Sequence, residues 1–136
     1  MQVHRWWSGI LLLGALACTS RVDARLELIA DARTPSPTFR IASASSVRGM
    51  RVERVEPFSN GWNAPLWQLL SLHGVAVAAP DSLSYGRVPL GFAQGAPAAV
   101  LFPGYYRLII DFADGSGSLD FDVGSDGQVT TGGPHR

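Results

Sequence analysis

The pattern that most constrains the fold of this chain is an alternation of apolar and polar residues with a period of two. In residues 105–113 the large apolar side chains fall on one face of an extended strand and the charged ones on the other. The apolar set is Tyr106, Leu108, Ile110 and Phe112. Residues 119–123 alternate in the same way, and no long run shows the 3.6-residue period of an amphipathic helix. The alternation predicts a β protein whose strands are buried on one face.

Other strand-like segments are separated by clusters of Gly, Pro, Asn and Asp. We predict strands at residues 25–32, 38–43, 50–56, 66–79 and 128–131, with a short helix as the alternative for residues 66–73. Residues 81–97 are expected to be irregular or to form edge structure, because Pro89 and Pro97 cannot donate to a sheet ladder. Residues 105–113 and 119–123 should pair antiparallel around a hairpin loop at residues 114–118.

Strands of this number and spacing in one small domain predict a mainly β fold, a single antiparallel β-sandwich. The segment from Leu101 to Tyr106 reads Leu-Phe-Pro-Gly-Tyr-Tyr. It resembles the entry to a late strand in immunoglobulin-like, fibronectin-like and prealbumin-like sandwiches. The resemblance implies that Pro103 and Gly104 make a turn and that the Tyr106 hydroxyl caps the corner. Such a motif indicates architecture and carries no activity.

The first residues form a separate segment. Arg5 is the one fixed charge before residues 6–17, which are uncharged and largely apolar. A membrane-spanning helix needs about 20 apolar residues, so this run is too short and is typical of the apolar region of a secretory signal. We therefore expect a signal helix that is cleaved from the mature protein.

The only cysteine follows this run directly. Residues 14–18 read Gly-Ala-Leu-Ala-Cys and resemble the lipobox of bacterial lipoprotein precursors, although Ala15 stands where leucine is usual. The resemblance implies cleavage before Cys18 and acylation of Cys18 by palmitate or similar chains. The alternative is an ordinary cleaved signal with an unpaired thiol. A second resemblance, to small uncharacterised bacterial lipoproteins, rests on Trp67 and on residues 85–92 and implies no function.

These features divide the chain into a lipoprotein signal peptide at residues 1–17, a lipidated Cys18 with a short tether at residues 18–24, a sandwich domain at residues 25–131 and a tail at residues 132–136. Thr19 stands where an aspartate would signal retention at the inner membrane in the lipoprotein family. We therefore expect an outer-membrane anchor facing the periplasm, with the inner membrane and the cell surface as alternatives.

Composition excludes several classes of function. The 11 basic residues are all Arg and balance 11 acidic residues, so no basic field exists to attract nucleic acid. Without lysine, the chain has no amine for Schiff-base chemistry. One cysteine allows neither an internal disulfide nor a cysteine-based zinc cluster. We expect no nucleic-acid partner.

No catalytic or metal-binding pattern emerges from the remaining polar residues. A calcium loop starting at Asp122 fails at two ligand positions, with Gly124 and Gly133 where oxygens are needed. Turn aspartates and a solvated strand face explain the same residues. A Ser-His-Asp site would require His73, yet no Gly-x-Ser-x-Gly elbow occurs; His73 is expected at a strand end with a satisfied hydrogen bond. We expect no catalytic residue, no metal and no cofactor.

Aromatic side chains are the remaining candidates for recognition. Trp67 and Tyr106 are expected in the core. Trp62, beside Asn60-Gly61, and Phe92, in the segment rich in Gly and Pro, are the two residues that we nominate for a recognition surface, with burial as the alternative. The leading hypothesis is a non-enzymatic, lipid-anchored protein that binds another envelope protein. The second is a module that binds a small ligand or carbohydrate.

Overall fold

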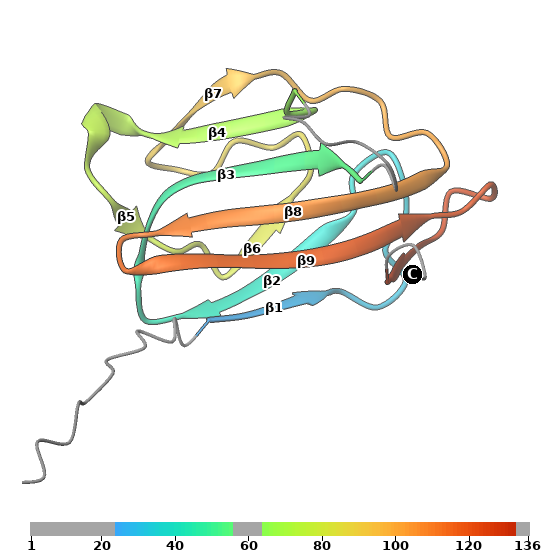
Figure 1. Cartoon of the computed structure of the whole chain (residues 1–136), viewed down its shortest axis with the longest axis horizontal. Coiled ribbons are helices and arrows are strands. Elements are labelled where there is room, and N and C mark those ends of the chain that lie inside the picture. Colours follow the sequence, from blue (N-terminus) through green and yellow to red (C-terminus); the bar gives the residue numbers. More distant parts are fainter. Residues whose placement is uncertain (1–23, 56–63, 133–136) are drawn as a thin grey trace, which may run out of the picture.

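Two antiparallel sheets pack against each other in the computed structural model, which describes residues 24–55 and 64–132 (Figure 1). The small sheet has the order β1-β2-β6, and its strands are β1 (Ala24–Leu28), β2 (Thr38–Ser43) and β6 (Ser82–Ser84). The large sheet has the order β10-β9-β8-β3-β4-β7, with β5 paired to β3. Its strands are β3 (Ser46–Arg54), β4 (Trp67–Ser71), β5 (Val77–Ala78), β7 (Phe92–Ala96), β8 (Gly104–Phe112), β9 (Gly115–Val123) and β10 (Val129–Thr131).

The strand order confirms a β-sandwich and follows the immunoglobulin arrangement. In that fold strands A, B and E form one sheet, and strands C, F and G form the other. Here β1, β2 and β6 take the places of A, B and E, while β3, β8 and β9 take the places of C, F and G. Strand β7 departs from the scheme, because it follows β6 in the chain and yet lies beside β4 at the edge of the large sheet.

Aromatic side chains join the two sheets at two places. Phe39 from β2 lies 5.2 Å from Phe121 of β9, and Tyr106 of β8 stacks on Phe121 at 5.5 Å. At the other place Trp67 of β4 meets the ring of Tyr85, just after β6, at 5.1 Å. All five are buried, and the predictions of core positions for Trp67 and Tyr106 are confirmed. Edge-on and offset ring contacts of this kind add to the stabilisation from apolar burial.

The hairpin of β8 and β9 is confirmed, but its predicted loop is wrong. Every residue of β8 pairs with β9, from Gly104 opposite Val123 to Phe112 opposite Gly115, which leaves only Ala113 and Asp114 in the turn. Residues 115–118 therefore belong to β9. At Gly117 a Cβ atom would lie 3.3 Å from the Phe112 ring, so a small residue here serves close packing within the ladder.

The predicted continuous strand over residues 66–79 is interrupted. Strand β4 ends at Ser71, a 3-10 turn (η1) covers Leu72–Gly74, and β5 resumes at Val77 along the same edge of β3. His73 has a φ of 59°, a left-handed conformation that ends the extended run. This segment therefore leaves the sheet for a few residues and projects from its end.

Other boundaries differ by a few residues. The first strand ends at Leu28 rather than residue 32, and β3 begins four residues before the predicted Met50. Residues 81–97 contain two short strands, β6 and β7, both at the edges of their sheets, as the prolines predict. Strand β10 confirms the last predicted strand.

The turn that opens β8 has the predicted construction. Gly104 has a φ of 151°, which only glycine adopts readily, and β8 begins at this residue. The Tyr106 hydroxyl donates a hydrogen bond of 2.5 Å to the carbonyl of Phe102, four residues upstream. Bonds of this type define the tyrosine corner of immunoglobulin-like sandwiches. Pro103, Gly104 and Tyr106 thus form the corner expected from the sequence.

Candidate functional site

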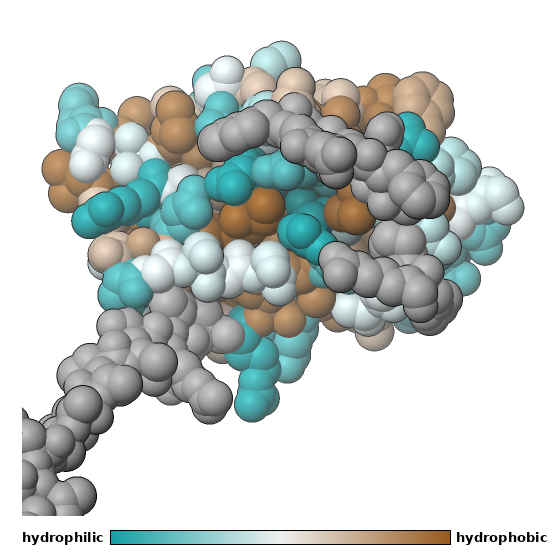
Figure 2. Space-filling view, viewed as in Figure 1, coloured by the Kyte–Doolittle hydropathy of each residue, from teal (hydrophilic) through white to brown (hydrophobic). Residues whose placement is uncertain are grey.

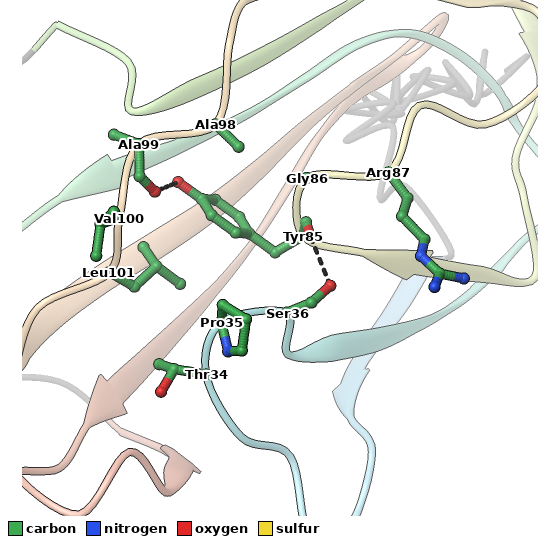
Figure 3. Close-up of a pocket in the computed structure, with 10 residues that line it drawn as sticks. All are labelled: Thr34, Pro35, Ser36, Tyr85, Gly86, Arg87, Ala98, Ala99, Val100 and Leu101. Atoms are coloured by element: carbon green, nitrogen blue, oxygen red, sulfur yellow. Dashed lines mark hydrogen bonds between the residues drawn. The ribbon is translucent and has the colours of Figure 1, made fainter.

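A groove of about 540 Å³ opens between three connecting segments at one end of the sandwich (Figure 3). One segment joins β1 to β2, the second follows β6, and the third joins β7 to β8. The lining residues are Thr34, Pro35, Ser36, Tyr85, Gly86, Arg87, Ala98, Ala99, Val100 and Leu101. Loops positioned by a rigid scaffold are a common location for binding sites.

Tyr85 ties the three segments together. Its backbone N–H donates to the carbonyl of Pro37 at 3.0 Å, and its own carbonyl accepts the Ser36 hydroxyl at 2.6 Å. Its phenol hydroxyl donates to the carbonyl of Ala99 at 2.6 Å. In Figure 3 the ring lies between Ser36 on one side and Ala99 on the other. One residue, through its backbone and its hydroxyl, therefore links the walls of the groove.

Burial fixes the protonation state of this phenol. Tyr85 is 4% exposed and packs on Trp67. Desolvation, together with a smaller effect of the neighbouring Tyr106, raises the pKa of Tyr85 to about 12, although the hydrogen bond to Ala99 opposes the shift. The hydroxyl is therefore neutral at physiological pH and remains a donor to Ala99.

The wall formed by residues 98–101 is extended chain held by a backbone bond. The N–H of Ala99 donates to the carbonyl of Leu66 at 2.9 Å, next to the start of β4. The side chains then alternate: Leu101 is buried in the core, while Val100 is 71% and Phe102 63% exposed. Two apolar side chains therefore project into solvent beside the groove. Exposed apolar groups around a concave surface are typical of interaction sites.

The opposite wall is held against the last strands. The N–H of Thr34 donates to the carbonyl of Gly127 at 2.9 Å, and the Arg33 guanidinium donates to the carbonyl of Asp126 at 3.2 Å. Gly127 has a φ of 81°, and a Cβ atom there would lie 2.8 Å from the Thr34 hydroxyl. The close approach of this wall to the β9–β10 turn therefore requires glycine.

Arg87 is the one charged residue of the lining. Its side chain is exposed, and no described residue forms a hydrogen bond or an ion pair with its guanidinium. The rest of the lining is apolar or offers hydroxyl and backbone groups. The groove therefore suits a partner that combines an apolar segment with a negative charge, because a guanidinium pairs well with a carboxylate.

Of the two residues that we nominated for recognition, the structure describes only Phe92. Phe92 is 6% exposed and belongs to the core, so the prediction that it forms a recognition surface is wrong. Phe92 begins β7 and is buried, whereas the next three residues of the strand are exposed, so the strand has no alternation that could have indicated its burial. Trp62 and Cys18 lie outside the described residues, as does the predicted signal helix.

The aspartates and His73 lie apart from the groove. Asp111 accepts a bond from Arg51 at 3.0 Å, Asp120 accepts two from Arg107, and Asp114 accepts one from Ser45. In residues 24–55 and 64–132 no group of three or more His, Cys, Asp or Glu side chains could hold a metal ion. His73 is exposed on η1, not at a strand end, and forms no hydrogen bond or ion pair with a described residue.

Compared with protein-family models, curated proteins and solved structures, this chain shows no significant match. None of the helical turns in the described part of the chain is long and apolar enough to span a membrane. The candidate site therefore rests on the geometry of this chain.

The sequence gives little sign of the groove. Ser36, Tyr85, Arg87 and residues 98–101 come from three distant segments, and no fixed spacing connects them. The pair Tyr85-Gly86 is the one local signal, since Gly86 has a φ of 86° and turns the chain directly after the buried ring.

We expect the substitution Tyr85→Phe to lower the free energy of unfolding by about 1 kcal/mol at neutral pH, because the Ala99 carbonyl loses its donor. In the variant, the free energy of unfolding should also fall less steeply as pH rises above about 10. Between the ordinary pKa of 10.0 and the raised value of about 12, the unfolded phenol loses its proton while the folded one keeps it, so stability falls as pH rises. Urea unfolding between pH 8 and pH 11 measures both effects.

Tyr105→Phe is the matched control, since Tyr105 is partly exposed and its hydroxyl has no hydrogen-bond partner among the described residues. It should behave like the unsubstituted protein at every pH. A Tyr85→Phe variant as stable as Tyr105→Phe, with the same alkaline slope, would show that the bond from the Tyr85 hydroxyl to Ala99 does not stabilise the groove walls.

Proposed function

We propose that this chain is a non-enzymatic lipoprotein of a bacterial envelope, anchored through acylated Cys18, whose sandwich binds another envelope protein. The anchor is supported by the lipobox-like sequence at residues 14–18 and by the short apolar run before it. Thr19 supports the outer membrane, facing the periplasm, as the site of the anchor. The inner membrane and the cell surface are the alternatives. No nucleic-acid partner is proposed, because the charges balance.

The observation that carries the binding role is the position and chemistry of the groove. It lies at the end of the sandwich where β1 runs into β2, whereas Ala24, at the start of β1, pairs with Ser43 at the other end (Figure 1). A protein tethered through residues 18–24 would therefore present the groove away from its anchor. Val100, Phe102 and Arg87 there offer apolar contact and one cation to a partner.

A small apolar ligand with an acidic group is the second candidate for the same groove. The observation in its favour is the volume of about 540 Å³, which lies within the usual range for small-molecule sites of roughly 300–1,000 Å³. A compound that raised the melting temperature of the protein, but not of an Arg87→Glu variant, would favour binding of a small ligand in the groove.

The anchor is tested by Cys18→Ser in the natural host or a related bacterium. The substitution should move the protein from the membrane pellet to the soluble fraction or leave the precursor uncleaved, because serine cannot form the thioether that carries the lipid. Fractionation and immunoblotting measure this. Membrane retention with normal processing would refute acylation at Cys18.

The groove is tested by site-specific photocrosslinking in intact cells. A photoreactive amino acid at position 100, where Val100 projects beside the groove, should give a discrete crosslinked protein. Arg87→Glu should reduce its yield at least about fivefold, because a repulsive charge replaces the guanidinium at the partner's acidic group; a contribution of about 1–3 kcal/mol is typical for a charged hydrogen bond.

Arg40→Glu is the matched control, since Arg40 is exposed on β2 and does not line the groove. A photoreactive residue at position 118, where Ser118 is exposed on β9, gives the background. Equal yields from positions 100 and 118, or equal losses with both arginine substitutions, would contradict binding in the groove.

A further inference from the structure

Three exposed apolar side chains gather at the end of the sandwich opposite the groove. Leu72 is 44%, Val75 64% and Leu90 100% exposed. Leu72 and Val75 belong to the turn at η1, and Leu90 lies in the turn before β7. The two turns are joined, since the N–H of Leu72 donates to the carbonyl of Gly91 at 2.9 Å. We call these three residues the apolar tip.

The first described residue of the chain lies at the same end. Ala24 pairs with Ser43, two residues of turn separate Ser43 from Ser46, and Ser46 pairs with Ala78 of β5 beside the tip. In Figure 1 η1, β5 and the start of β1 are all at the left of the molecule, and Figure 2 shows apolar surface at that end. The tip and the beginning of the domain therefore face the same way.

The length of chain before Ala24 limits how far this end can stand from a membrane. Five residues separate Cys18 from Ala24, so six backbone steps of 3.3–3.6 Å span at most about 20 Å. An acyl chain on Cys18 enters the hydrocarbon layer, so the tip would lie within reach of the lipid headgroups. A short tether also gives the tip a high effective concentration at the surface, so a weak contact would be well populated.

Charged side chains of both signs lie at this end. Arg25 is the second residue of β1, and Arg48 lies at the irregularity in β3. Both are exposed, and no described residue forms an ion pair or a hydrogen bond with either guanidinium. His73 is also exposed on η1. The carboxylates are Asp81, exposed between β5 and β6, and Asp114, which accepts the Ser45 hydroxyl at 2.8 Å. Since cations and carboxylates are both present, contact with a bilayer at this end rests on burial of the apolar side chains in its interface.

Resting on the lipid anchor proposed above, we propose that the apolar tip inserts into the headgroup region of the bilayer and orients the sandwich, so that the groove points away from the membrane. Acyl chains alone would leave the domain free to rotate on its tether. Contact at Leu72, Val75 and Leu90 adds a second point of attachment, which selects one orientation.

The test uses the acylated full-length protein in vesicles of phosphatidylcholine and phosphatidylglycerol. Leu90→Cys is labelled with an environment-sensitive fluorophore, and lipids carrying a nitroxide near the headgroup act as quencher. Val100→Cys is the matched control, because Val100 is a similarly exposed apolar residue at the opposite end. We expect the label at position 90 to be quenched several-fold more strongly than the label at position 100.

A third sample carries Leu90→Cys together with Leu72→Ser and Val75→Ser. Both side chains are exposed, so the fold should be retained, and quenching at position 90 should fall by at least half. Flotation of each sample with the vesicles reports the anchor separately. Equal quenching at positions 90 and 100 in protein that floats would overturn the tip contact and leave the anchor standing.

Two other results would also overturn the inference. Shielding of the label at position 90 without quenching by the nitroxide lipid would show that a protein, such as a second copy of this chain, covers the tip. Protein that does not float would remove the anchor, and the tip contact with it.

Discussion

The core of this protein depends on the ring and hydroxyl of Tyr85. A small sheet of three strands faces a large sheet of six strands with β5 alongside, so part of the inner face of the large sheet must be covered by connecting chain. Tyr85 packs on Trp67 and binds the backbone of Pro37 and Ala99. The contacts that close the core also set the distance between the walls of the groove. Stability and the shape of the candidate site are therefore linked through one residue.

The two ends of the sandwich differ in chemistry. One end carries the groove with Arg87 and the exposed Val100, and the other carries the apolar tip and the start of β1. In the proposed arrangement the lipid at Cys18 brings the second end to the membrane and leaves the first free for a partner. The antiparallel strands connect the ends rigidly, so orientation at the membrane would determine where the groove is presented.

Alternation of side chains was sufficient to predict the sandwich and the β8–β9 pairing, because one-sided burial imposes a period of two. The Tyr106 corner was expected from the resemblance of residues 101–106 to a strand entry in such sandwiches. Local turn signals were less reliable. The Gly and Ser residues at 115–118 suggested a loop, yet full pairing with β8 draws them into the ladder. The sequence did not predict the burial of Phe92, because a short edge strand between Gly and Pro residues carries little periodic signal. The groove could not be predicted, since its walls are brought together by long-range contacts of Tyr85 that no local pattern records.

We propose that lipid on Cys18 holds this sandwich at a membrane. Mass spectrometry of the N-terminal peptide of the mature protein, isolated from envelopes, tests this proposal. We expect a peptide that begins at Cys18 and carries a diacylglyceryl group, with or without a further amide-linked acyl chain. A mature protein that begins at another residue, or a Cys18 peptide of unmodified mass, would contradict it.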